Sequence, residues 1–282
     1  MVSEQLQKKI DRAVKLLQSV ANGYDGEIEV AYSGGKDSDV ILQLAKESGI
    51  RYRAIYKNTT IDPPGTLKHV RDMGAEVRMP KENFGQLIQR GGFPNMFKRF
   101  CCQKLKEYKV LDKAIHGVRK SESRARAERY SEPTKCRYYG SKKPENHVEV
   151  ILPILDWTDE DVLEFIKDRQ IKLAPVYYDE NGEIDITRRL GCMCCPLQWK
   201  GKRLQSFKQY PHMVKFYLRN GEKFRQRHPD GAQTLKYADV YEWFVRDVFY
   251  DSQEKWEASK GGLFDERPDY KKFLEDYFNI TL

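Results

Sequence analysis

The residues with the clearest chemistry are two serines, two glycines, a lysine and an aspartate in one run, Ser33-Gly34-Gly35-Lys36-Asp37-Ser38. The preceding segment, Glu27 to Tyr32, alternates like a strand, and the following segment, Asp39 to Glu47, has apolar residues at helical spacing. A glycine turn between a strand and a helix start leaves backbone N–H groups and the positive end of the helix dipole available to an anion. The run therefore predicts a phosphate-binding loop, in which Asp37 binds a cation or orients the loop.

Cysteine is the second residue type that could do chemistry here. Five of the six cysteines fall in two groups, the adjacent pair Cys101-Cys102 and the run Cys192-Met193-Cys194-Cys195. Adjacent cysteines would form a strained disulfide at best, whereas Cys192 and Cys195 have the C-x-x-C spacing of metal ligands. A distant second pair can complete such a centre, as iron–sulfur or as zinc, because spacing alone does not distinguish the two metals.

The bulk composition restricts the location and the partners. No run of eighteen apolar residues is present and the first twenty residues lack the apolar core of a secretory signal, so we expect a cytoplasmic protein without a membrane span. The net charge of +8 and the pI of about 9.0 favour polyanionic partners. Residues 117–143 carry nine basic and three acidic residues. This basic segment is expected to contact nucleic acid or to form a solvated loop that closes over a nucleotide.

The order of expected elements predicts the fold class. Strands are expected at residues 27–32, 52–56, 76–79, 114–118 and 148–154, and helices at 1–22, 39–47, 66–73, 84–89, 101–113 and after the capping box of Thr158 and Asp161. Alternation of this kind predicts an α/β fold with a Rossmann-like parallel sheet and helices on both faces. Aromatic and charged helical segments follow at 200–209, 212–227, 235–251 and 269–278. We therefore expect a nucleotide-binding domain at 1–196 and a helical C-terminal extension at 197–282.

The loop sequence resembles the PP-loop, S-G-G-x-D-S, of the ATP pyrophosphatase superfamily. It lacks the spacing of a Walker A loop. Four stretches resemble the phosphoadenosine-phosphosulfate (PAPS) reductase family more closely, and together they span residues 27 to 200. They are the loop itself, the adjacent cysteine pair, Gly117-Val118-Arg119-Lys120-Ser121-Glu122-Ser123, and Leu155 to Val162 followed by Gly191-Cys192-x-x-Cys195.

The resemblance implies the adenine nucleotide alpha hydrolase-like fold and a set of site residues. By this resemblance the PP-loop binds an adenine nucleotide, ATP with Mg²⁺ or else adenylyl-sulfate or phosphoadenylyl-sulfate. Arg119 lies against its phosphates or sulfate, with Glu122 and Ser123 orienting the arginine, and Lys36, Asp37 and Arg119 act in catalysis. In the iron–sulfur branch a cysteine pair and a C-x-x-C hold a 4Fe–4S cluster, which assigns the cluster to Cys101, Cys102, Cys192 and Cys195. Cys194 is additional to that pattern.

One departure from the family pattern separates the candidate functions. Reductases of the family attack sulfur with a cysteine near the C-terminus, and this chain has no cysteine after Cys195. The preferred hypothesis is ATP-dependent adenylation with pyrophosphate release, coupled to sulfur transfer. Nucleic acid is a candidate acceptor of the sulfur, as in DNA phosphorothioation. The alternatives are a sulfonucleotide reductase in which Cys194 or Cys136 is the nucleophile, and a non-catalytic nucleotide- or nucleic-acid-binding subunit. A sulfur-donor protein or a thioredoxin-like reductant would be the protein partner.

Overall fold

A computed structural model describes residues 2–249 and 268–282 of the chain. The chain forms two compact units. Unit 1 comprises residues 1–58, 62–79 and 106–191, and unit 2 comprises residues 59–61, 80–105 and 192–282. The segment 80–105, which carries the first cysteine pair, thus groups with the C-terminal helices. The domain boundary expected at residue 196 stays a prediction.

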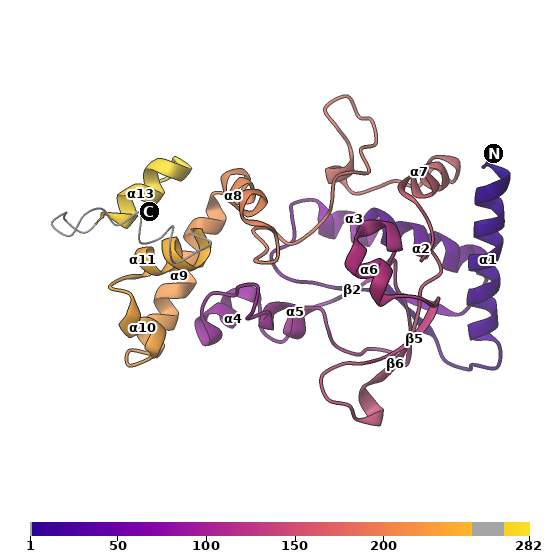
Figure 1. Ribbon diagram of the computed structural model, residues 1–282, viewed down its shortest axis with the longest axis horizontal. Coiled ribbons are helices and arrows are strands. Elements are labelled where there is room, and N and C mark those ends of the chain that lie inside the picture. Colours follow the sequence, from indigo (N-terminus) through magenta and orange to yellow (C-terminus); the bar gives the residue numbers. More distant parts are fainter. Residues whose placement is uncertain (1, 250–267) are drawn as a thin grey trace. The chain divides into compact units, whose positions relative to one another are not determined.

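Unit 1 is built on a six-stranded sheet with the order β3-β2-β1-β4-β6-β5, and it confirms the predicted fold class (Figure 1). The strands are β1 (Ile28–Tyr32), β2 (Tyr52–Lys57), β3 (Glu76–Arg78), β4 (Lys113–Ile115), β5 (Thr134–Tyr138) and β6 (His147–Ile151). All neighbours pair in parallel except β5, which runs antiparallel to β6. The chain leaves β1 toward one edge of the sheet and returns to β4 on the other side, and ligands bind at such a switch point.

The helices of unit 1 are α1 (Glu4–Ala21), α2 (Lys36–Ser48), α3 (Thr66–Asp72), α6 (Arg124–Arg129) and α7 (Asp159–Asp168), with single 3-10 turns at Lys120–Glu122, Pro144–Asn146 and Pro175–Tyr177. Four of these helices, α1, α2, α3 and α7, bury apolar side chains, whereas α6 buries none. In α1 the side chains of Leu6, Ile10 and Leu17 are buried. The predicted capping box opens α7, because the hydroxyl of Thr158 accepts from the N–H of Asp161 at 3.2 Å.

Three elements differ from the prediction. The helix expected over 101–113 is only α5 (Phe100–Leu105), and β4 begins at Lys113. The strand expected to reach residue 154 ends at Ile151, shortly before Pro153, which has no N–H to donate to a sheet. Strand β5 lies inside the basic segment and was not predicted, because its half-exposed sequence lacks an apolar alternation.

Unit 2 is helical and has an aromatic core. Its helices are α4 (Phe84–Gly91), α5, α8 (Lys200–Gln209), α9 (His212–Arg227), α10 (Ala232–Lys236), α11 (Val240–Phe244), a π-helical turn at Val245–Phe249, and α13 (Tyr270–Phe278). The bounds of α8 and α9 match the prediction, and the end of the helix predicted over 235–251 lies outside the described residues. The rings of Phe93 and Trp243 lie 4.1 Å apart between centroids. Among the described residues, no helix has the length and apolarity needed to cross a membrane.

Candidate functional site

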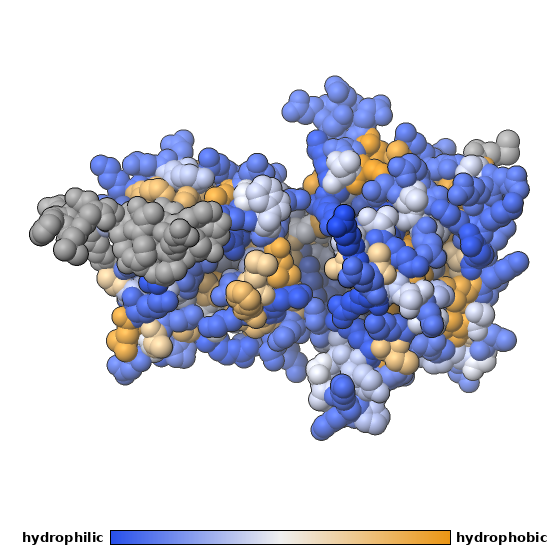
Figure 2. Space-filling model, in the orientation of Figure 1, coloured by the Kyte–Doolittle hydropathy of each residue, from blue (hydrophilic) through white to orange (hydrophobic). Residues whose placement is uncertain are grey.

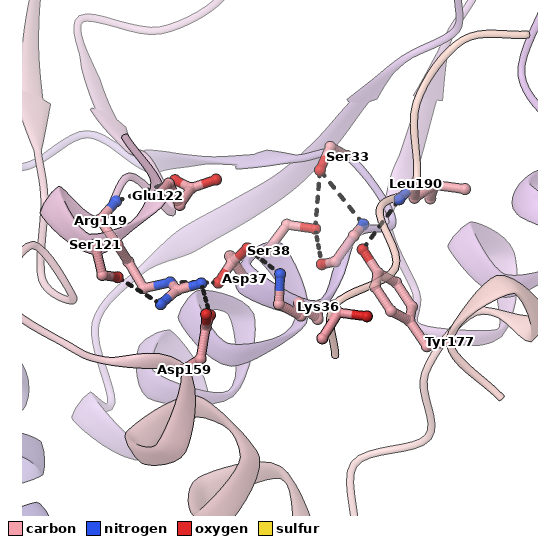
Figure 3. Close-up of polar contacts among 12 residues, drawn as sticks. Ser33, Lys36, Asp37, Ser38, Arg119, Ser121, Glu122, Asp159, Tyr177 and Leu190 are labelled. Atoms are coloured by element: carbon pink, nitrogen blue, oxygen red, sulfur yellow. Dashed lines mark hydrogen bonds and ion pairs between the residues drawn. The ribbon is translucent and has the colours of Figure 1, made fainter. Parts of the chain in front are cut away.

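The predicted PP-loop is a tight turn between β1 and α2, held by its own hydroxyl groups (Figure 3). The hydroxyl of Ser38 donates to the carbonyl of Gly35 at 2.7 Å, and the hydroxyl of Ser33 donates to that of Ser38 at 3.2 Å. Gly34 has a φ of +74°, a left-handed conformation that favours glycine. Since α2 begins at Lys36, its first turn and its dipole face the space above the loop.

A cavity of about 300 Å³ lies over this loop, entirely within unit 1. Its floor is the PP-loop, including the buried side chain of Lys36. The end of β4 forms a second wall, where a Cβ on Gly117 would lie 2.8 Å from the carbonyl oxygen of Asp37. That contact explains why glycine stands at this position. The cavity thus occupies the switch point between β1 and β4, where the fold predicts a ligand.

Sequence reasoning missed three residues that line this cavity, Arg126, Tyr177 and Arg189. The hydroxyl of Tyr177 accepts from the N–H of Leu190 at 3.3 Å, which holds the segment carrying Arg189 beside the loop (Figure 3). Arg126 pairs with Glu122, and burial and then the charge of Arg189 lower its pKa. Two guanidinium groups that repel one another at a cavity wall would be stabilised by an anionic ligand. Arg126 belonged to the predicted basic segment, whereas no motif indicated Arg189.

Arg119 is oriented toward the PP-loop but is saturated by protein groups (Figure 3). Its Nε donates to Asp37 Oδ1 and its Nη2 to Asp159 Oδ1, both at 2.7 Å, while Nη1 donates to the hydroxyl of Ser121 at 2.8 Å. The side chain is 1% exposed and does not line the cavity. The structure therefore shows Arg119 holding Asp37 in place, and direct contact with phosphate stays a prediction.

Glu122 and Ser123 organise the turn after Arg119. The carboxylate of Glu122 accepts from the backbone N–H of Arg119 at 3.3 Å, and the hydroxyl of Ser123 caps α6 by accepting from the N–H of Arg126 at 3.2 Å. Glu122 also lines the cavity. Of the predicted site residues, the structure thus brings Ser33, Gly35, Lys36, Asp37, Ser38 and Glu122 to one cavity.

A buried polar group beneath the loop fixes α2 to β1 and α3. The carboxylate of Asp39 accepts from the hydroxyl of Tyr32 and lies 3.1 Å from His69 Nε2, which lies 3.0 Å from the same hydroxyl. Burial raises the pKa of Asp39 and the pKa of Tyr32. Buried polar groups are stable only when hydrogen-bonded, so this triad specifies how the first turn of α2 sits on the sheet.

His116 is a titratable group in the cavity wall that the sequence did not indicate. Its ring forms no hydrogen bond with any residue of the described ranges, 2–249 and 268–282, although it lines the cavity at the end of β4. Burial, followed by the charges of Arg137 and Lys57, lowers the pKa of His116 to about 4. The imidazole is therefore neutral at physiological pH, and the positive charges of the cavity come from lysine and arginine.

The thiols of both cysteine groups lie in unit 2. Cys101, Cys102, Cys192 and Cys194 belong to one apolar cluster there. A hydrogen bond to Cys102, then burial and the neighbouring thiols of Cys102 and Cys195, raise the pKa of Cys101. The C-x-x-C segment is fixed by the thiol of Cys192, which donates to the hydroxyl of Thr59 at 3.5 Å, and by the N–H of Met193, which donates to the carbonyl of Ile61 at 2.8 Å. The two predicted ligand pairs are thus brought together.

The donor set at this centre is all sulfur. All six cysteines of the chain are free thiols. Within the part of the chain that the structure describes, no three cysteine, histidine or carboxylate side chains converge as they would around a single metal ion. An iron–sulfur cluster binds its thiolates through different iron atoms, so it places them farther apart than one zinc ion does. Both the binding of a metal by Cys101, Cys102, Cys192 and Cys195 and the identity of that metal stay predictions.

Cys194 differs from the other four thiols of this group. Its side chain is 1% exposed, its backbone has a φ of +52°, and its N–H donates to the hydroxyl of Ser206 at 3.0 Å. Burial raises the pKa of Cys194 to about 12. A nucleophile in sulfur chemistry must be an accessible thiolate, and this environment disfavours both properties.

Fold and loop together define the class of the chain as a PP-loop α/β protein. A family model for the phosphoadenosine phosphosulfate reductase domain matches residues 27–198, and the chain belongs to this family. The chain is 27% identical over 223 residues to an uncharacterized protein of Methanocaldococcus jannaschii, a match that covers 74% of this chain and 51% of that protein. It is 26% identical over 220 residues to sulfate adenylyltransferase subunit 2 of Streptomyces lavendulae, covering 68% of each. The chain thus spans about half the length of the archaeal relative.

Solved structures with a similar fold are more distant in sequence. A phosphoadenylyl-sulfate reductase from Candida auris is 14% identical, with a TM-score of 0.45 over 66% of this chain and 96% of that one. A U34-tRNA thiolase from Methanococcus maripaludis with its 4Fe–4S cluster is 15% identical, with a TM-score of 0.42 over 81% of each chain.

Proposed function

We propose that the cavity over Ser33–Ser38 binds an adenine nucleotide and that the chain uses ATP to adenylate an acceptor, with release of pyrophosphate. The observation that carries this proposal is the cavity itself, in which the PP-loop, the start of α2 and a buried lysine converge. Family membership and the sulfate adenylyltransferase subunits among the relatives support a nucleotide as the ligand. Backbone N–H groups, a helix dipole and lysine together stabilise the charge of the phosphates.

Each residue of the loop has a distinct task in this proposal. Lys36 neutralises the phosphates as the bond between the α- and β-phosphates breaks, and Arg126 and Arg189 contact the outer phosphates from the opposite wall. Asp37 presents its carboxylate toward Mg²⁺, which would neutralise the leaving pyrophosphate. Arg119 acts as a positioning residue, because its two ion pairs fix Asp37 relative to Asp159.

The thiols of unit 2 would supply the sulfur chemistry. Cys101, Cys102, Cys192 and Cys195 would hold the 4Fe–4S cluster, with zinc as the alternative metal. A bound cluster can pass electrons or carry sulfur to an activated acceptor. Three of the proposed ligands, Cys101, Cys102 and Cys192, belong to an apolar cluster, which limits the access of water. The sulfur donor would be a separate protein or small molecule, and the acceptor would be nucleic acid.

A sulfonucleotide reductase is the weaker alternative, because the buried Cys194 is a poor nucleophile and Cys136 lies on the edge strand β5. The other alternative is a nucleotide-binding subunit without catalysis. The sulfate adenylyltransferase relatives support it, because their name describes them as a subunit.

The test is pyrophosphate release by anaerobically purified full chain supplied with ATP, Mg²⁺ and nucleic acid. Release that is lost in Lys36→Ala and retained in the exposed control Lys46→Ala supports the proposal. Sulfite release from adenylyl-sulfate with thioredoxin, abolished in Cys194→Ser, would replace it with the reductase. Nucleotide binding without any turnover would support the non-catalytic nucleotide-binding subunit instead. Iron and sulfide analysis with visible absorption decides the metal, since stoichiometric zinc would overturn the cluster.

A further inference from the structure

The stretches that carry the thiols of unit 2 contain no acidic residue. Residues 83–105 and 192–221 include ten lysines and arginines but neither aspartate nor glutamate. The whole chain has 42 acidic residues among 282, which is roughly one residue in seven. Two stretches far apart in sequence meet at the thiols and share this depletion. Both stretches therefore carry positive charge without an acidic residue of their own.

Large apolar side chains are exposed close in sequence to both cysteine groups. Phe97 is 97% exposed and Trp199 is 69% exposed, four residues before Cys101 and four residues after Cys195, respectively. The smaller exposures of Met96 and Leu197 adjoin them. Elsewhere the protein surface in view is largely hydrophilic, with hydrophobic side chains in small separate patches (Figure 2). We call residues 95–102 and 192–202 the thiol frame.

Local structure holds both aromatic residues on defined backbone. The carboxamide of Asn95 accepts from the N–H groups of Phe97 at 2.9 Å and of Lys98 at 2.8 Å, which forms a compact turn. Trp199 is the residue before α8, and its carbonyl accepts from the N–H of Arg203 at 3.1 Å. Aromatic side chains on fixed backbone lose little entropy when a flat ligand stacks on them.

Two lysines of the frame, Lys98 and Lys202, have no carboxylate partner among the described residues. The first turn of α8 carries lysines and no acidic residue, although the positive end of a helix dipole favours acidic residues. Lysines at the positive end of a helix dipole repel it, and bound phosphate groups would offset that repulsion.

We propose that the thiol frame binds a single-stranded segment of nucleic acid, with bases stacked on Phe97 and Trp199 and phosphates against Lys98 and Lys202. Unpaired lysines beside exposed aromatic rings are the pattern that recognises single strands, whose bases are free to stack. This proposal rests on the proposed function in one respect: when the bound strand is the acceptor, the acceptor lies next to the thiols.

The test measures the affinity of the full chain, purified without oxygen, for a fluorescent mixed-sequence oligonucleotide of about 16 nucleotides. Single-stranded RNA and DNA are compared with the corresponding duplex and with heparin. We expect single strands to bind more tightly than duplex. Phe97→Ala and Trp199→Ala should each weaken binding about tenfold, and Trp199→Phe should retain most of it. Leu235→Ala is the matched control, because this exposed leucine of unit 2 lies outside the frame.

Several results would overturn the proposal. They are duplex or heparin binding as tightly as single strands, both alanine variants binding like the wild type, or no binding of any oligonucleotide. A melting temperature equal to that of the wild type verifies that each variant is folded. Pyrophosphate release without oligonucleotide binding would refute this inference alone. Oligonucleotide binding by a chain that never binds ATP would refute the proposed function alone.

Discussion

The two basic regions of the chain, residues 117–143 of unit 1 and the thiol frame of unit 2, differ in what their charges contact. In unit 1, Arg119 pairs with Asp37 and Asp159, and Lys120 lies 2.7 Å from Asp156. In unit 2, Lys98 and Lys202 have no carboxylate partner among the described residues. The comparison teaches that the density of charge in a sequence does not indicate which charge is available to a ligand.

The same contrast applies to aromatic residues near the charges. In unit 1 the side chains of Arg129 and Lys135 lie against the ring of Tyr130, at 5.7 and 5.2 Å from its centroid. In the thiol frame Phe97 and Trp199 face solvent. Most charges of the basic segment of unit 1 therefore contact protein groups, whereas the frame presents its aromatic side chains outward.

The largest expected effect comes from breaking the ion pairs of unit 1. Arg119→Ala removes a side chain that is 1% exposed, takes the ion-pair partner from Asp159 and leaves Asp37 with Lys36 alone. We expect the free energy of unfolding, measured with denaturant, to fall by about 3 kcal/mol, and nucleotide affinity to fall with it. The exposed Arg124→Ala should change stability by less than about 0.5 kcal/mol. Equal, small effects of both variants would contradict the structural role of Arg119.

A smaller effect is expected from His116, whose lowered pKa makes the stability of the protein depend on pH. The unfolded chain binds a proton at His116 near pH 6.5, and the folded chain binds it only near pH 4, because of burial, Arg137 and Lys57. This lowered pKa makes the unfolded state bind more protons in that window. Stability should therefore fall as the pH drops from 6.5 toward 4, by about 1 kcal/mol per pH unit. His116→Gln should remove that part of the slope, and Arg137→Gln should raise the pKa of His116 in an NMR titration. An unchanged slope would show that His116 does not titrate differently in the two states.

The smallest expected effect separates the two basic regions directly. Each lysine that contacts a phosphate of a single strand contributes about 0.7 to the slope of log affinity against log salt. Lys98→Gln and Lys202→Gln should each lower the slope for a single-stranded oligonucleotide by that amount. Lys120→Gln should leave it unchanged, because this lysine is paired with Asp156. The reverse ranking would place the nucleic acid on the basic segment of unit 1.

The sequence predicted elements best where a pattern was local. The strand, glycine turn and helix around residues 28–48 and the bounds of α8 and α9 follow from apolar spacing and capping signals. Strand β5 was not predictable, because pairing with β6 stabilises a sequence that has no alternation of its own. The helix expected over 101–113 stops at Leu105, which shows that apolar spacing did not define its end.

The site residues also divide into those that belong to a local motif and those that only the tertiary fold brings to the site. The PP-loop residues and the cysteine pairs are sequence motifs, so they were predictable. The burial of Arg119 was not, because it depends on Asp159, forty residues later in the chain. Arg189, Tyr177 and His116 enter the cavity only through the tertiary fold, and no spacing in the sequence indicates them.

The central claim is that the hollow over Ser33–Ser38 binds a nucleotide by its phosphates. Calorimetric titration of the anaerobically purified chain with ATP and Mg²⁺ tests it most directly. We predict saturable binding that is weakened at least tenfold in Lys36→Ala and unchanged in Lys46→Ala, a lysine at the far end of the same helix. Absence of ATP binding, or equal affinity in all three proteins, would contradict the account.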